Sequence, residues 1–192
     1  MYIRLIYILM LLYSNMMYSQ KNNCNITKGS KEIIKVNKED VICLSRHTNK
    51  NGVLIYTFGI WCSPCVLHLP NALKLAQDYN LDLYVLLIDK EDDFKTINLT
   101  VNYLKKTRED INIAILKDES EKNRNRKYKR FLKKITPQQF ENINGMSKYI
   151  LINKKGDVIM VTNWKDNKKY DWRDDSFMLK EKIIPLLSPS NN

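Results

Sequence analysis

The chain has 192 residues, of which 44% are hydrophobic, and it carries a formal net charge of +11 at neutral pH. This length suits one domain with flanking segments and a hydrophobic core, while the hydrophobic fraction is too low for a protein with several membrane spans. Lysine greatly outnumbers arginine, and Asn, Ile and Tyr are also abundant. Because this combination is typical of an AT-rich genome, the charge is not taken as evidence of a nucleic-acid partner.

The first residues have the pattern of a secretory signal peptide. Arg4 precedes a short apolar run over 5–12, and Ser19 supplies a small residue before a polar stretch. The apolar run is much shorter than the roughly 20 residues that a membrane-spanning helix needs. We therefore predict that residues 1–19 are a signal peptide and that the protein is exported to the periplasm or cell envelope of a bacterium. An uncleaved membrane anchor is the alternative, and export also argues against a nucleic-acid partner.

The elements after this segment follow from hydrophobic periodicity. Residues 20–32 are polar without a hydrophobic period, which predicts a flexible leader. Over 33–44 apolar residues return in short bursts, which favours one or two peripheral strands. A strand is predicted over 53–58, and a helix containing Pro70 should follow it, because apolar residues recur at helical spacing over 66–76.

The second half of the chain alternates between strand and helix patterns. In order, we predict a buried strand over 81–88, a helix over 94–104, a strand over 111–116, a basic helix over 122–135, a hairpin of 149–152 with 158–161, and a helix over 177–187. This order predicts an α/β domain over 33–188, with a central mixed sheet flanked by helices on both faces.

The basic helix has eight Lys and Arg residues, with apolar side chains between them at near-helical spacing. This pattern is typical of an amphipathic helix whose basic face is solvated. A docking site for an acidic partner or an anionic membrane is the alternative interpretation, so membrane association stays open.

The most informative motif is Trp61-Cys62-Ser63-Pro64-Cys65, which follows the strand over 53–58. A cysteine at such a strand-to-helix junction lies at a helix N-terminus, where free N–H groups and the helix dipole stabilise a thiolate. The second cysteine lies one turn later on the same face, so the pair can open and close a disulfide. We predict that Cys62 is the nucleophile and that Cys65, more buried, resolves the mixed disulfide. Pro64 removes one N–H group near the thiolate, which favours a reducing direction.

The element order and this motif resemble the thioredoxin fold and, more specifically, the TlpA/ResA-like extracytoplasmic thiol-disulfide oxidoreductases. The resemblance covers about 53–161 and rests on the motif, on Leu69-Pro70, and on 145–152 with the following Lys155-Gly156 turn. It implies a cofactor-free, monomeric enzyme that reduces disulfide-containing proteins and draws on an upstream electron donor. It also implies that Trp61, Met146 and Ser147 form the platform for the substrate.

The chain departs from this family at three positions around the dithiol. Ser147 stands where the family has a cis-proline, and because a cis bond before a non-proline residue costs about 3–4 kcal/mol, we predict a trans peptide there. His68 stands where the family often has a glutamate that assists proton transfer; an imidazole can act as acid or base, or simply pack. Tyr56 stands where thioredoxin has a buried aspartate, and a phenol cannot replace that carboxylate at neutral pH.

Cys24 and Cys43 complete an even count of four cysteines. In an exported protein, one interpretation is a structural disulfide between them. The other is that Cys43 is a small core residue and Cys24 a free thiol. His47 lies in a polar segment, and no role is assigned to it.

Two further hypotheses compete with the oxidoreductase, which needs no metal. The first is a copper carrier with Cys62, Cys65 and His68 as ligands, because two thiolates and an imidazole suit Cu(I). The resemblance adds that the family proline keeps metals away from the dithiol, and this chain lacks it. The second is a redox-inactive domain that serves only as an interaction module.

Overall fold

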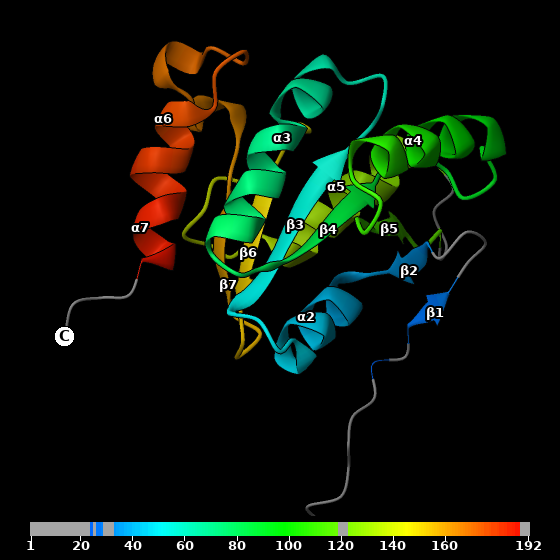
Figure 1. The fold of residues 1–192 in the computed structure, drawn as a ribbon, viewed down its shortest axis with the longest axis horizontal. Coiled ribbons are helices and arrows are strands. Elements are labelled where there is room, and N and C mark those ends of the chain that lie inside the picture. The colour runs from blue at the N-terminus through cyan, green and yellow to red at the C-terminus, as the bar shows by residue number, and fades with distance from the viewer. Residues whose placement is uncertain (1–23, 25, 29–32, 119–122, 189–192) are drawn as a thin grey trace, which may run out of the picture.

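The computed structural model describes residues 24, 26–28, 33–118 and 123–188 (Figure 1). Among these residues, one mixed sheet has the strand order β1-β2-β5-β4-β3-β6-β7. Its strands are β1 (Thr27–Lys28), β2 (Ile34–Val36), β3 (Gly52–Phe58), β4 (Asp82–Leu87), β5 (Asn112–Leu116), β6 (Tyr149–Asn153) and β7 (Val158–Val161). Strands β2, β5, β4 and β3 are mutually parallel, while β1, β6 and β7 are each antiparallel to the strand they pair with.

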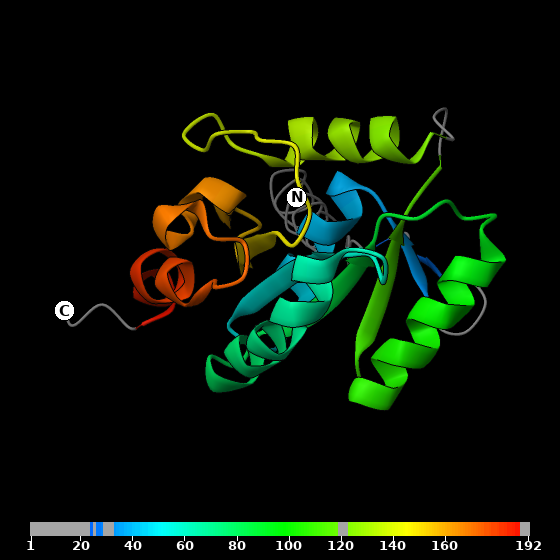
Figure 2. The same cartoon turned by 90° about the horizontal axis from the view of Figure 1, so that it is seen from above.

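Helices cover both faces of this sheet, as Figures 1 and 2 show. They are α2 (Lys38–His47), α3 (Ser63–Asp78), α4 (Phe94–Thr107), α5 (Arg124–Ile135) and a C-terminal helical segment made of α6 (Ser176–Met178), a π-helical turn (Leu179–Ile183) and α7 (Ile184–Leu187). Helices α3 and α4 and the C-terminal segment share a core with one face, and α2 and α5 share a core with the other.

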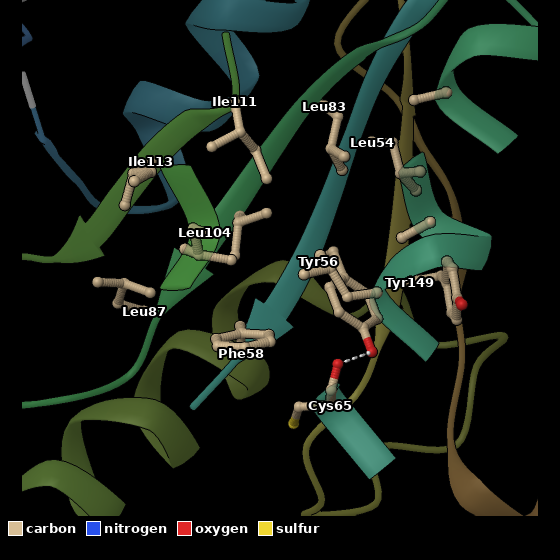
Figure 3. Close-up of a cluster of buried hydrophobic side chains, with 14 of the residues drawn as sticks. Leu54, Tyr56, Phe58, Cys65, Leu83, Leu87, Leu104, Ile111, Ile113 and Tyr149 are labelled. Carbon is tan, nitrogen blue, oxygen red and sulfur yellow. Dashed lines mark hydrogen bonds between the residues drawn. The ribbon is translucent and has the colours of Figure 1, made fainter. Parts of the chain in front are cut away.

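Strand β3 is central to both cores, because all seven of its residues are buried. Leu54, Tyr56 and Phe58 point to the core under α3 and α4, part of which Figure 3 shows, while Val53 and Ile55 point to the other core. The predicted α/β, thioredoxin-like fold is thereby confirmed. The strand before the two cysteines lies between a parallel strand and an antiparallel hairpin, with helices on both faces.

The prediction of strands over 33–44 is wrong beyond β2, because helix α2 begins at Lys38. Asn37 is its N-cap: the Asn37 side chain accepts a hydrogen bond from the Asp40 N–H, and the Asp40 carboxylate accepts one from the Asn37 N–H. This capping box satisfies two amide groups at the start of the helix. The capping box is visible in the sequence as Asn37 followed by Asp40, but the prediction over 33–44 used only the spacing of apolar residues.

Part of the predicted leader takes part in the fold. Within the predicted leader, Thr27–Lys28 pairs with β2 as strand β1, and Cys24 forms a disulfide with Cys43 of α2. The expectation of flexibility over 20–32 does not hold for these residues. The predicted signal peptide over 1–19 lies outside the described residues. In the part of the chain that the structure describes, no helix has the length and apolar character needed to cross a bilayer.

Helix α5 confirms the predicted basic amphipathic helix, with one correction. Lys127, one of the eight basic residues expected to be solvated, is buried. Its ammonium donates hydrogen bonds to the Asp118 carboxylate and to the backbone carbonyls of Asp89 and Leu116. A buried cation with this many acceptors is satisfied, and Lys127 thereby fastens α5 to the chain just after β4 and at the end of β5.

Candidate active site

The two cysteines of the motif lie where the C-terminal end of β3 leads into α3. Cys62 is the N-cap of α3, and its sulfur accepts a hydrogen bond from the Cys65 N–H at 3.3 Å. The two sulfurs are joined in a disulfide, with the Cα atoms 5.2 Å apart. Cys62 is 8% exposed, whereas Cys65 is fully buried. Cys62 is therefore the more accessible of the two residues, and it lies at a helix N-terminus, a position that favours a thiolate.

Trp61, the residue before Cys62, is 46% exposed. Its indole N–H donates to the Asp89 carboxylate at 3.0 Å, and the guanidinium carbon of Arg124 lies 4.2 Å from the ring centroid. Burial raises the pKa of Asp89, an effect that the Trp61 hydrogen bond and the Arg124 charge oppose. Gly59 is required under the ring, because a Cβ there would lie 2.9 Å from it. Contacts with Asp89, Arg124 and Gly59 thus fix the position of the indole ring.

The Met146-Ser147 loop also lies at the site, and the residue that follows it is hydrogen-bonded to β3. The Thr57 N–H donates to the Lys148 carbonyl at 3.0 Å, and the Lys148 N–H donates to the Thr57 hydroxyl at 2.9 Å. The peptide before Ser147 is trans, as predicted, since the described residues contain no cis bond. Ser147 has a φ of 59°, in the left-handed region. Proline has φ fixed near −65°, so the serine brings a different backbone conformation to this loop.

A buried polar network lies behind the dithiol. The Tyr56 hydroxyl donates to the Cys65 carbonyl at 3.0 Å (Figure 3) and lies 2.8 Å from the Ser147 hydroxyl. The Ser147 hydroxyl also donates to the Pro64 carbonyl at 3.3 Å. Burial raises the pKa of Tyr56 well above its ordinary value. The phenol therefore stays protonated and anchors the first turn of α3, in agreement with the expectation that it cannot act as the missing aspartate.

His68 extends this network toward the C-terminal segment. The side chain is buried, at 3% exposed, and its Nδ1 lies 3.3 Å from the Ser147 hydroxyl and 3.6 Å from the Asp175 carboxylate. Asp175, the residue before α6, also accepts hydrogen bonds from the Asn71 amide and the Tyr149 hydroxyl. The structure thus brings His68 and Ser147 together and adds Asp175 and Tyr149, which the sequence analysis missed.

The missed residues differ in how well the sequence signalled them. Asp89 directly follows a buried parallel strand, and side chains at that position meet at the carboxyl edge of a sheet, where sites form. The position of Asp89 could therefore have been used to predict it as a site residue from the sequence. Asp175 and Arg124 belong to no motif and lie far from the cysteines in sequence, so only the packing of the C-terminal segment and of α5 brings them to the site.

The copper-ligand set proposed from the sequence does not form a cluster. Cys62 and Cys65 are joined to each other, and the Nδ1 atom of His68 faces Ser147 and Asp175. In the described ranges, the group of three close candidate ligands comprises Cys24, Cys43 and His47 instead.

The second pair of cysteines forms the structural disulfide that was one of the two interpretations. Cys24 and Cys43 have Cα atoms 5.6 Å apart. The Nδ1 atom of His47, one helical turn beyond Cys43, lies 2.9 Å from the Cys43 carbonyl and 3.5 Å from the Cys24 sulfur. With both sulfurs in a disulfide, this group is a cross-link between the N-terminal segment and α2.

The fold and the site define a thioredoxin-like domain with a Cys-x-x-Cys disulfide at a helix N-terminus. No family model matches the sequence, and a search of curated proteins finds no match. Among solved structures, the chain is similar to the crystal structure of a thio-disulfide isomerase from Thermus thermophilus. The identity is 16% and the TM-score 0.41, over 60% of this chain and 68% of that chain.

Proposed function

We propose that the protein is a thiol-disulfide oxidoreductase that reduces protein disulfides outside the cytoplasm, in the manner of the TlpA/ResA-like enzymes it resembles. The observation that carries this proposal is the disulfide between Cys62, partly accessible at a helix N-terminus, and the fully buried Cys65. The signal-peptide pattern and the Cys24–Cys43 disulfide support an oxidising, extracytoplasmic compartment.

The geometry suits a two-step exchange. The Cys62 thiolate attacks one sulfur of a substrate disulfide, which forms a mixed disulfide and releases the other substrate sulfur as a thiolate. The Cys65 thiolate then attacks the Cys62 sulfur, and the second substrate sulfur leaves with the electron pair. The substrate is reduced and the enzyme ends in the disulfide form seen in this structure. An upstream dithiol donor must then reduce the pair again.

The exposed surroundings of Cys62 suit a peptide substrate. The indole of Trp61 offers an apolar, rigid surface, fixed by its hydrogen bond to Asp89 and by Arg124. The half-buried loop of Met146 and Ser147 lies beside it, since the Met146 Cε atom and the indole both come close to Gly59. These elements form the proposed platform on which a substrate disulfide meets the Cys62 sulfur.

Replacing each cysteine in turn tests this function. Cys62→Ser should abolish insulin reduction in the presence of a dithiol donor, because the attacking sulfur is lost. Cys65→Ser should accumulate mixed disulfides with substrate, visible by mass spectrometry, because the resolving sulfur is lost. As the matched control, the double variant Cys24→Ser/Cys43→Ser should keep its turnover. Insulin reduction by Cys62→Ser at the rate of the unmodified protein would refute the assignment.

A further inference from the structure

The second disulfide has a histidine directed at both of its sulfurs. The Nδ1 atom of His47 lies 3.5 Å from the Cys24 sulfur and 3.6 Å from the Cys43 sulfur. These three potential ligand atoms lie within 4.8 Å of one another. The two cysteines are half-buried and His47 is exposed, so the cluster can be reached from solvent. No step proposed for the Cys62–Cys65 pair uses it.

Helix α2 explains why two of these side chains meet. Cys43 and His47 are four residues apart in this helix, so they lie on the same face. The two histidines of the H-E-x-x-H zinc motif have the same spacing. Helix α2 ends at His47, and the partial negative charge of a helix C-terminus favours a cation there. The link to Cys24 brings a third donor atom from the N-terminal segment.

The distances within the cluster match the ligand set of a tetrahedral zinc ion. With Zn–S bonds of about 2.3 Å and a Zn–N bond of about 2.0 Å, a sulfur and a nitrogen ligand lie about 3.5 Å apart, and two sulfurs about 3.8 Å apart. The distances from Nδ1 of His47 to the two sulfurs already have this value. Only the two sulfurs must move apart, which requires reduction of the disulfide.

We propose that the reduced form of this pair binds a zinc ion together with His47, a function separate from the proposed oxidoreductase activity. An external dithiol transfers two electrons to the Cys24–Cys43 disulfide and becomes a disulfide itself, which leaves two thiols. Zn²⁺ then binds both thiolates and the neutral imidazole, and the two thiol protons go to solvent. Water takes the fourth position, which three protein ligands leave open. The N-terminal segment is thereby linked to α2 by the ion in place of the disulfide.

Two neighbouring groups act on the same histidine or lie beside it. Nδ1 of His47 is 2.9 Å from the Cys43 carbonyl, and a ring with its proton on Nδ1 donates it there. Zinc binding moves this proton to Nε2 and gives up that hydrogen bond, a modest loss for an exposed side chain. The adjacent cation, Arg46, donates to the Lys155 carbonyl at 3.1 Å. Another segment of the chain therefore holds this charge.

Metal titration of a variant without the other dithiol tests the site. The variant Cys62→Ser/Cys65→Ser keeps Cys24 and Cys43 as its only cysteines. After reduction with a phosphine under argon it should bind one Zn²⁺ per chain, measured by competition with a chromophoric chelator. Its disulfide form should bind none at the same concentrations. Co²⁺ in place of Zn²⁺ should give the intense visible bands of a tetrahedral ion and sulfur-to-cobalt charge transfer in the near ultraviolet.

A change of the third ligand separates a built site from a simple pair of thiols. In the same background, His47→Ala should weaken Zn²⁺ binding by at least about 10-fold, a loss typical even of an outer-shell partner. Arg46→Ala, which removes the adjacent cation from the same helix, is the control and should not weaken binding. Equal affinity with and without His47, an octahedral cobalt spectrum, or no zinc bound after reduction would each overturn the inference.

Thermal denaturation decides the question if reduction weakens the fold. Because an ion that binds only the folded state stabilises it, Zn²⁺ should raise the melting temperature of the reduced variant, and His47→Ala should show a smaller increase. A melting temperature that Zn²⁺ leaves unchanged would overturn the zinc site. Neither result bears on the Cys62–Cys65 pair, whose activity the insulin assay tests separately.

Discussion

Ser147 shows how one residue changes the surroundings of a dithiol. With a left-handed backbone it directs its hydroxyl to within hydrogen-bonding distance of Tyr56, Pro64 and His68. Proline could provide neither that backbone nor that hydroxyl. The serine therefore couples the loop to the polar network behind Cys65, which a proline in this position could not do.

Replacing Ser147 by proline should be harmful. Ser147→Pro forces φ away from its native value and removes the hydroxyl, so we expect a loss of more than about 1 kcal/mol in the free energy of unfolding. Ser147→Ala is the control, because it removes the hydroxyl and leaves φ unconstrained; it should lose less. Urea denaturation of both variants measures the difference. A proline variant as stable as the alanine variant would contradict the assigned backbone conformation.

Lys148, the next residue, gives a pH-dependent prediction. Its ammonium is buried and donates to the Thr162 carbonyl at 2.7 Å, and burial lowers its pKa from 10.5 to about 8. Between these values the unfolded chain binds more protons than the folded one, so stability should rise with pH through this window. Lys148→Met should remove that rise, which amounts to about 3 kcal/mol across the window. Urea denaturation of both proteins at a series of pH values tests this, and parallel curves would show the prediction to be wrong.

At the scale of elements, α2 shows why short runs of apolar residues do not distinguish a strand from a helix. In this region β2 contributes one buried residue, Val36, while α2 buries Asp40, Val41 and Ser45 at helical spacing, and Asn37 separates the two elements. The capping box decides the boundary, because it satisfies amide groups that a strand would have paired with a neighbour. By contrast, β3 and α3 were predictable, since β3 is a continuous apolar run and α3 repeats its apolar residues at helical spacing.

Removing the cap of α2 should lower stability. Asn37→Ala eliminates the acceptor for the Asp40 N–H, and such changes typically cost about 1 kcal/mol. Glu39→Ala, in the same first turn but exposed, is the control and should cost only a few tenths, ~0.3 kcal/mol. Thermal or urea denaturation compares the two. An equal loss in both variants would show that the capping box does not fix the start of this helix.

At the scale of the whole molecule, the two disulfides have different places in the fold. The Cys62–Cys65 pair follows the C-terminal end of β3, where the site lies, whereas Cys24–Cys43 joins the N-terminal segment to α2, which precedes the start of β3. The first closes a loop within one helical turn, and the second links positions 19 residues apart. Only the second constrains the unfolded chain substantially.

Loss of the Cys24–Cys43 cross-link should therefore affect stability and leave the reactivity of Cys62 alone. For a loop of this length the entropy estimate is about 3 kcal/mol, so Cys24→Ser/Cys43→Ser should lose roughly that free energy of unfolding. The alkylation rate of Cys62 serves as the internal control and should not change. A variant with unaltered stability would mean that the N-terminal segment contributes nothing to the folded domain.

The sequence by itself determined the fold class and the position of the two sulfurs of the Cys-x-x-Cys motif. Both depend on short stretches of chain: a buried strand, a turn and the first turn of a helix. Only the tertiary structure decided what surrounds those sulfurs. Asp175, Tyr149, Asp89 and Arg124 come from four distant segments, and the Cys24–Cys43 pairing was one of two open alternatives. The physical reason is that a helix N-terminus stabilises a thiolate through consecutive residues, whereas a buried network forms between side chains that meet only when the core packs.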